Sequence, residues 1–274
     1  MPKIMDGRKL SNEIKVRVKN DVEKLKERGI DVGLALMLVG DNPASKQYFQ
    51  AILKAAKKVG INVYEYVLPP NVSVNEILNL VRSINKDERI NGLLVIFPLP
   101  QRINTRRVVN TISPAKDIDG LGAISVGRLA AEESTLQIFR DSTYESLIDE
   151  RRILNVSNFL PCTPFGVIRL LEYYGVVIKG KNAVVVGKSL ATGKPLSLML
   201  LAKEATVTIC HRSTHNLEFH LKNADIICSA TGVNNLINGD MIDDGAVVVD
   251  IGVSLLDEGK LVGDVDFESA SKKT

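Results

Sequence analysis

A glycine-containing turn in the second half of the chain has the residues needed to bind a dinucleotide. The sequence VGKSLATGKP (186–195) follows an apolar run typical of a buried strand and opens a helical pattern. Gly187 permits a tight turn, and the backbone N–H groups at the start of a helix can face a pyrophosphate. The spacing from Gly187 through Ser189 to Gly193 differs from Gly-x-Gly-x-x-Gly. By itself the turn is therefore equally consistent with an ordinary connection between a strand and a helix.

Two basic residues lie where a dinucleotide-binding domain would choose between NAD and NADP. Lys188 is in the turn, and Arg212 follows the strand-like run TVTIC (206–210). An acidic residue after this strand would accept from a ribose 2′-hydroxyl, whereas a basic residue can pair with a 2′-phosphate. The sequence predicts NADP as the cofactor, although both side chains could instead be solvated surface residues. The cofactor-binding candidates are Gly187, Lys188, Ser189, Gly193, Arg212, Thr231 and Gly232.

Five segments resemble those of the methylenetetrahydrofolate dehydrogenase/cyclohydrolase family, of the bifunctional FolD type. The resemblance covers most of residues 1–127 and 160–268. It implies a folate substrate of one-carbon metabolism and a homodimer. The segments are VGDNPASKQYFQAILKAAKKVGI (39–61), GLLVIFPLP (92–100), SPAKDIDG (113–120), LPCTPFG (160–166) and VVVGKSLATGKPLSLMLL (184–201).

Two positions depart from the family pattern. The family has Tyr-x-x-x-Lys in the first segment and Val-Gln-x-Pro-Leu-Pro in the second; here Tyr48 is kept, but Ile52 and Ile96 replace the Lys and the Gln. The resemblance assigns the proton transfers of ring hydrolysis to that Lys and Gln, and isoleucine can neither donate nor accept a proton. Hydride transfer needs no general base. We therefore expect NADP-dependent dehydrogenase activity with weak or absent cyclohydrolase activity.

Tyr48 and Asp119 are the candidate catalytic residues. Tyr48 lies four residues before Ile52, on the same face of a predicted helix, and the resemblance places it beside the folate. The resemblance also implies that Asp119 contacts the pterin ring, whose 2-amino and N3–H groups are adjacent donors for a carboxylate. From spacing alone, a turn capped by Asp117 and Asp119 is favoured. Lys54 points about 200° away from Ile52 around the helix and is expected at the surface.

Other functions remain open. A full bifunctional enzyme would need another residue to support hydrolysis. A catalytically silent paralogue that binds folate or a partner is favoured by an unusually long charged connection at 128–159 and by the ending GDVDFESASKKT (263–274). The resemblance implies a Pro-Gly-Gly-Val-Gly-Pro motif and a last helix after that ending. A two-domain dehydrogenase of the shikimate type would call for different polar residues in the first domain.

The cysteines and histidines do not predict a metal site. Three cysteines without a Cys-x-x-Cys pair indicate buried thiols in a reducing compartment, not disulfides or zinc. His211, His215 and His220 lie on either side of a strand end and a helix start, so their side chains need not converge.

Composition excludes several classes of protein. The chain has 274 residues and a net charge of only +3, which gives no reason to expect nucleic acid as a partner. Neither a secretory signal nor an apolar run of about 18 residues is present, so we expect no membrane contact and a cytoplasmic location. The basic stretch 15–28 is typical of a solvated helix.

Apolar strand-like runs alternate with helical patterns in two series. Such alternation predicts an α/β protein with two domains, each with a parallel sheet covered by helices, and a cleft between them. We expect a folate-binding domain at 1–122 and a Rossmann-type NAD(P)-binding domain at 123–274. The second domain includes the atypical insertion near 130–158, with helical pieces at 130–140 and 145–154. The strands are expected at 33–40, 62–68, 92–97, 182–187, 206–210, 225–230 and 246–252, and the helices at 43–59, 73–85 (with Ser73 and Glu76 in a capping box), 163–175, 194–204 and 216–224.

Overall fold

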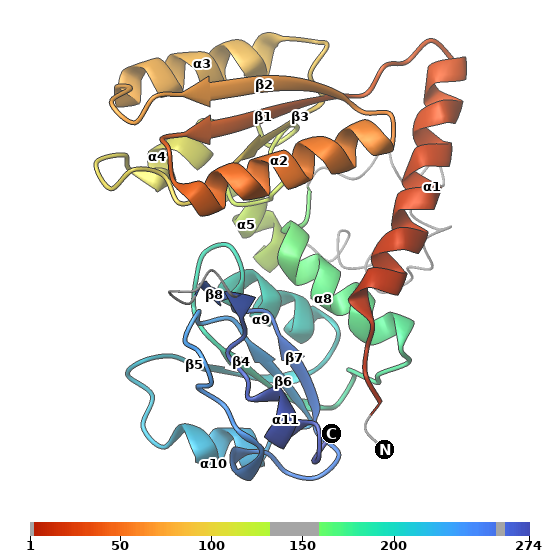
Figure 1. Cartoon of the computed structure of the whole chain (residues 1–274), viewed down its shortest axis with the longest axis vertical. Coiled ribbons are helices and arrows are strands. Elements are labelled where there is room, and N and C mark those ends of the chain that lie inside the picture. Colours follow the sequence, from red (N-terminus) through yellow and green to blue (C-terminus); the bar gives the residue numbers. More distant parts are fainter. Residues whose placement is uncertain (1–2, 132–158, 256–260) are drawn as a thin grey trace. The chain divides into compact units, whose positions relative to one another are not determined.

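The computed structural model of the chain describes residues 3–131, 159–255 and 261–274. These residues form two compact units (Figure 1). The N-terminal unit contains Gly7–Ala131, and the C-terminal unit contains Pro161–Thr274 together with the residues before Gly7. Both units are α/β structures with parallel sheets, which confirms the expected fold class. The helical pieces expected in the insertion lie outside the described residues, except for Ala130 and Ala131 at the end of a helix.

The N-terminal unit has a three-stranded parallel sheet in the order β2-β1-β3. Apolar β1 lies in the centre, and helices cross from each strand to the next, as the alternating pattern predicts. The strands are β1 (Gly33–Val39), β2 (Asn62–Leu68) and β3 (Gly92–Val95); the helices are α1 (Gly7–Glu27), α2 (Pro43–Lys58), α3 (Val74–Lys86), α4 (Thr105–Val109) and α5 (Ala123–Ala131).

Successive residues of β1 point to opposite faces of this sheet and meet different helices. Leu36 and Leu38 pack with Phe49 of α2 in one apolar cluster. Met37 packs with Ile77 of α3 in a second, larger cluster. The sheet therefore has α2 on one face and α3 on the other, as Figure 1 shows. Packing of α2 against this face of the sheet places the start of α2 near the carboxyl end of β1.

Side chains at the first turns determine where two helices begin. In α2 the Asn42 side chain accepts a hydrogen bond from the Ser45 N–H at 3.0 Å. In α3 the expected capping box is present: Ser73 Oγ accepts from the Glu76 N–H at 3.2 Å, and the Glu76 carboxylate accepts from the Ser73 N–H at 2.8 Å. Each bond satisfies a donor that has no partner inside the helix.

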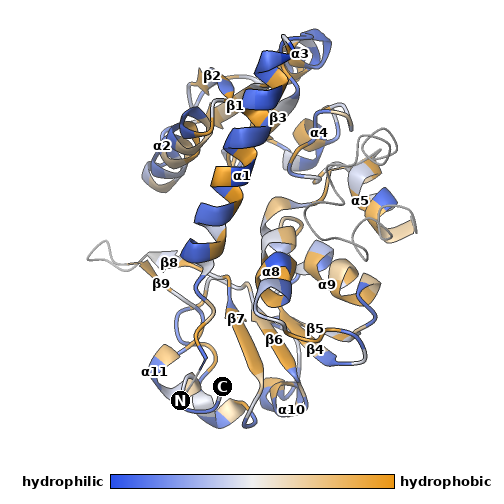
Figure 2. Ribbon diagram, turned by 90° about the vertical axis from the view of Figure 1, so that its right-hand side faces the viewer, coloured by the Kyte–Doolittle hydropathy of each residue, from blue (hydrophilic) through white to orange (hydrophobic). Residues whose placement is uncertain are grey.

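The first helix is largely solvated, as the sequence indicates. Within α1 only Val22 is buried, and Figure 2 shows a mostly hydrophilic helix. Among the described residues, no helix is both long and apolar enough to cross a bilayer.

The C-terminal unit has a four-stranded parallel sheet in the order β5-β4-β6-β7, with β4 and β6 inside. Figure 2 shows that its strands are hydrophobic, and the last four residues of β4 are buried. The strands are β4 (Asn182–Val186), β5 (Thr206–Cys210), β6 (Ile226–Ser229) and β7 (Val247–Asp250), with an antiparallel pair of β8 (Ser254–Leu255) and β9 (Leu261–Val262); the helices are α8 (Cys162–Tyr173), α9 (Gly193–Ala202), α10 (Leu217–Lys222), the 3-10 turn η2 (Gly239–Met241) and α11 (Phe267–Ala270).

Candidate functional site

The predicted cofactor residues of the C-terminal unit lie at one edge of its sheet. Val186, Cys210 and Ser229, the last residues of β4, β5 and β6, are register partners. Because the three strands are parallel, the residues that follow them leave the sheet side by side. Gly187, Arg212 and Thr231 are within two residues of those ends. Ligands of open α/β sheets bind at this carboxyl edge.

Close backbone packing explains both glycines of the loop after β4. Gly187 has φ +119°, and a Cβ atom there would overlap the carbonyl oxygen of Ala230. A Cβ atom on Gly193 would overlap the carbonyl oxygen of Gly187. The loop therefore folds tightly against its own start and against the turn after β6, a geometry that side chains larger than hydrogen would prevent.

The same loop leaves several backbone donors available. Ser189 Oγ accepts from the N–H groups of Thr192 at 3.1 Å and Gly193 at 3.3 Å, which caps the start of α9. Within the described ranges, no hydrogen bond engages the backbone N–H groups of residues 188–191. Free amides before a helix start are suited to an anion such as phosphate. Ser189, one of the predicted cofactor-binding residues, therefore also caps the start of α9.

Arg212 lies at the tip of a short turn after β5. The His211 N–H donates to Thr214 Oγ1 at 2.8 Å, and the Thr214 N–H donates to the His211 carbonyl at 2.7 Å. These two hydrogen bonds fix the backbone of the 211–214 turn. The Arg212 side chain on this turn is exposed, and so is that of Lys188 in the loop after β4. Both basic residues therefore lie within two residues of strand ends at the carboxyl edge, with their side chains accessible to solvent.

A buried carboxylate that sequence reasoning missed organises the turn after β6. Asp264 is fully buried, and its Oδ2 accepts from Ser229 Oγ, Thr231 N and Thr231 Oγ1 at 2.8, 2.7 and 2.9 Å. Its Oδ1 accepts from the Val233 N–H at 3.0 Å. Its neighbours in the sequence are Gly263 and Val265, and nothing in this pattern distinguishes a buried carboxylate from an exposed one.

Ile52 and Ile96 of the N-terminal unit pack in the same apolar cluster. Ile96 follows β3 and is 1% exposed, and its N–H donates to the Met37 carbonyl at 2.8 Å. Ile52 is partly buried on α2 and packs against this cluster. Tyr48, one helical turn earlier, is 57% exposed. Lys54 is exposed, which confirms it as a surface residue.

The two aspartates of the 113–120 segment have different environments. Asp117 is buried and accepts from Gly122 N at 2.8 Å and Ser125 Oγ at 2.6 Å, so it caps the start of α5. Asp117 also forms a parallel bridge with Leu93 of β3. This bridge is isolated: the chain turns directly after it, with the Gly120 N–H donating to the Asp117 carbonyl at 2.9 Å, and Asp119 is partly buried in that turn. The capping alternative thus holds for Asp117.

The cysteine prediction is confirmed at two positions and wrong at one. Cys210 and Cys228 are buried, and burial raises the pKa of the Cys228 thiol to about 12. Cys162, the first residue of α8, is exposed. None of the three described cysteines forms a disulfide. Within the described ranges, no three His, Cys, Asp or Glu side chains are grouped so that they could hold a metal ion.

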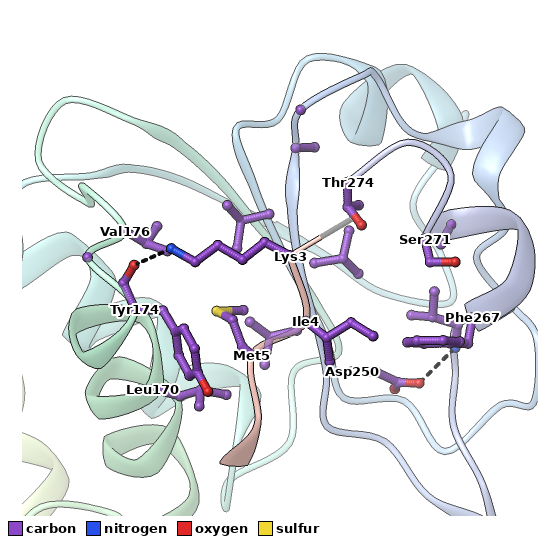
Figure 3. A pocket seen from close by; sticks show the side chains of 18 residues that line it. Lys3, Ile4, Met5, Leu170, Tyr174, Val176, Asp250, Phe267, Ser271 and Thr274 are labelled. Carbon is purple, nitrogen blue, oxygen red and sulfur yellow. Dashed lines mark hydrogen bonds between the residues drawn. The ribbon is translucent and has the colours of Figure 1, made fainter. Parts of the chain in front are cut away.

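A cavity of about 490 Å³ lies beside β7 within the C-terminal unit (Figure 3). The N-terminal segment contributes to its wall: Lys3 Nζ donates to the Tyr174 carbonyl at 3.4 Å, and the Asp6 N–H donates to Tyr174 Oη at 2.8 Å. Asp250, the last residue of β7, presents the main carboxylate of the lining. Burial, helped by the nearby charge of Asp264, raises the pKa of Asp250.

Comparisons with known proteins cover both units. Residues 5–119 match "Tetrahydrofolate dehydrogenase/cyclohydrolase, catalytic domain", and residues 161–274 match the "NAD(P)-binding domain" of the same family. The chain is 43% identical over 270 residues to "Bifunctional protein FolD" of Moorella thermoacetica, covering 98% of the chain and 88% of that protein.

Solved structures agree. The bifunctional FolD enzyme of Campylobacter jejuni superposes with a TM-score of 0.88 at 39% identity, covering 99% of this chain and 88% of that one. The FolD enzyme of Trypanosoma brucei, solved with NADP cofactor and inhibitor, gives a TM-score of 0.87 at 30% identity with the same coverage. The chain therefore belongs to the tetrahydrofolate dehydrogenase/cyclohydrolase family.

Proposed function

We propose that this chain is an NADP-dependent 5,10-methylenetetrahydrofolate dehydrogenase with weak or absent methenyltetrahydrofolate cyclohydrolase activity. Family membership supports the folate substrate, and the named relatives support a dehydrogenase. The observation that carries the second half of the proposal is the apolar cluster containing Ile52 and Ile96. It offers no proton donor or acceptor from those two side chains.

The carboxyl edge of the C-terminal sheet fits NADP. The free amides of residues 188–191 and the start of α9 suit the pyrophosphate, and the tight packing at Gly187 lets the backbone approach it closely. Arg212 and Lys188 would pair with the 2′-phosphate, with Thr231 and Gly232 on the neighbouring turn. When bound, NADP supplies the acceptor for a hydride.

For oxidation of the methylene carbon, the main contribution of the protein is to position the folate and the NADP. The two nitrogens that flank this carbon stabilise its developing positive charge, and no proton has to move. Holding two reactants in a productive geometry can lower a barrier by roughly 7–11 kcal/mol. We assign Asp119 to the donors of the pterin edge and Tyr48 to a contact beside the ring.

Opening the methenyl ring requires more. Water must add to the carbon, and protons must then reach or leave the nitrogens. General acid–base catalysis of such proton transfers commonly increases the rate by about 10²–10⁴-fold. Isoleucine cannot provide it. The loss of both polar groups at neighbouring positions separates oxidation from hydrolysis in this chain.

Two assays on purified protein test the proposal. Reduction of NADP with 5,10-methylenetetrahydrofolate should be rapid, and hydrolysis of preformed methenyltetrahydrofolate should be close to the uncatalysed rate. Hydrolysis as fast as hydride transfer would establish the full bifunctional enzyme, which the names of the relatives favour. Absence of both reactions in folded protein would favour a catalytically silent paralogue that binds folate or a partner.

Three further expectations belong to the same proposal. The functional domains extend over 1–122 and 123–274, the protein acts as a homodimer, and it resides in the cytoplasm. Light scattering coupled to gel filtration tests the dimer, and cell fractionation tests the location.

A further inference from the structure

Asp264 is a fully buried carboxylate that has no part in the dehydrogenase chemistry outlined above. It lies in the segment between β9 and α11 and is 31 to 35 residues later in the sequence than its hydrogen-bond partners, which are on residues 229–233. It accepts four hydrogen bonds from the turn between Ser229 and Val233. A buried carboxylate is expensive to desolvate unless such donors surround it.

The turn held by Asp264 packs against the predicted pyrophosphate loop. Its residue Ala230 has the carbonyl oxygen that a Cβ atom on Gly187 would overlap. The Ala230 N–H donates to the Val186 carbonyl at 2.8 Å, directly before Gly187. A displacement of this turn would therefore change the backbone contacts that position the loop after β4.

Asp264 is itself held in place from the end of β7. The carboxylate of Asp250 accepts from the N–H groups of Asp264 at 3.0 Å and Val265 at 3.1 Å. Figure 3 shows Asp250 in the cavity wall with a dashed line to this backbone. Two glycines leave room for the arrangement: a Cβ atom on Gly263 would overlap Asp250, and one on Gly252 would overlap Asp264.

We propose that Asp264 is a positioning residue for dinucleotide binding: it fixes the 229–233 turn against Gly187 and thereby sets the shape of the pyrophosphate loop. The inference rests on the proposed function, since that function places NADP at this edge. An apolar or neutral residue could fill the same space, but it could not accept four bonds from the turn at once.

The variant Asp264→Asn tests this role. The amide has one acceptor oxygen, and its NH₂ group faces at least one buried donor, so the turn loses part of its support. We expect the Kd for NADP, measured by isothermal titration calorimetry, to rise about tenfold or more, which corresponds to about 1.4 kcal/mol. The KM for NADP should rise with it, whereas the KM for the folate substrate should stay unchanged.

Asp225→Asn is the matched control. Asp225 precedes β6 at the opposite end of the same strand, and its carboxylate likewise accepts a backbone bond, from Asn182 N at 2.8 Å. This control should bind NADP as the parent does. Hydrogen exchange without NADP gives an independent readout: the amides of Thr231 and Val233 should exchange faster in Asp264→Asn and at the parent rate in the control.

The outcomes separate the two proposals. If the parent protein binds no NADP, the proposed function fails and this inference fails with it. If the parent binds and Asp264→Asn binds equally well, only the inference is overturned. Should Asp264→Asn not fold, Ser229→Ala removes a single donor. A two- to fivefold loss of NADP affinity in that folded variant supports the role of Asp264, and unchanged affinity with unchanged exchange overturns it.

Discussion

Ile52 stands at the margin of its apolar cluster, where a longer side chain could reach solvent. It is partly buried, whereas Ile96 is almost completely buried. The double variant Ile52→Lys with Ile96→Gln would restore an amine and an amide at these positions. We expect methenyl hydrolysis to increase by about 10²-fold or more, because general acid–base assistance becomes available. Hydride transfer should change only a few-fold, and the ratio of the two initial rates measures the effect.

The variant with leucine at both positions is the control, since it keeps the side chains apolar and nearly the same in volume. Its hydrolysis should equal that of the parent. A glutamine at the buried position costs stability of roughly 1–3 kcal/mol, so urea unfolding should accompany the kinetics. A folded Lys/Gln variant that hydrolyses no faster than the leucine control contradicts the assignment.

Arg212 provides the second test at the scale of single residues. Its exposed side chain on the 211–214 turn is assigned to the 2′-phosphate, which NAD lacks. Arg212→Ala should raise the KM for NADP about tenfold, the equivalent of ~1.4 kcal/mol, and leave the KM for NAD nearly unchanged. Lys179→Ala removes the same charge before β4, at the other end of the strands, and should affect neither value. Equal losses for both cofactors in Arg212→Ala would show that Arg212 does not recognise the phosphate.

The start of α3 shows how a local signal sets an element. Ser73 and Glu76 exchange two hydrogen bonds, as their spacing predicts. Ser73→Ala should lower the free energy of unfolding by about 1 kcal/mol, because the Glu76 N–H loses its acceptor. Ser83→Ala, an exposed position late in the same helix, should change it by less than about 0.5 kcal/mol. Urea denaturation followed by circular dichroism measures both; equal effects would mean that the cap does not stabilise α3.

Elements with strong periodicity were predictable, and short elements were not. The bounds of β2 and β5 agree with the sequence pattern, and β3 ends two residues earlier than expected. The five-residue helix α4 and the β8–β9 pair have too few residues for a periodic signal. They depend on contacts with the rest of the fold, which no local pattern encodes.

At the scale of the whole molecule, parallel register made much of the candidate site predictable. Residues that follow adjacent parallel strands must share one edge, and the structure places Gly187, Arg212 and Thr231 there. The support beneath that edge was not predictable. Asp264 and Asp250 act on backbone groups distant in the sequence, and only the folded chain brings these groups to them.

The pH dependence of the stability of the folded chain follows from Asp250. Burial raises its pKa above the ordinary value of 3.8, so the native state binds this proton more tightly than the unfolded chain does. Its contribution to stability is complete below 3.8 and is lost as the pH rises through the raised pKa. Asp250→Asn cannot titrate. The free energy of unfolding of the parent minus that of this variant should therefore fall as the pH increases from about 3.5 to 7.

Asp225→Asn serves as the control, because the pH dependence of its difference in unfolding free energy should have the opposite sign. The hydrogen bond from Lys181, together with that from the Asn182 N–H, lowers the pKa of Asp225. Its contribution is present above 3.8 and disappears as the pH falls through the lowered pKa. The parent-minus-variant difference should thus be flat above about pH 5 and decrease below it. Urea unfolding at half-unit pH steps measures both differences; a flat difference for Asp250→Asn between pH 3.5 and 7 would contradict a raised pKa at the end of β7.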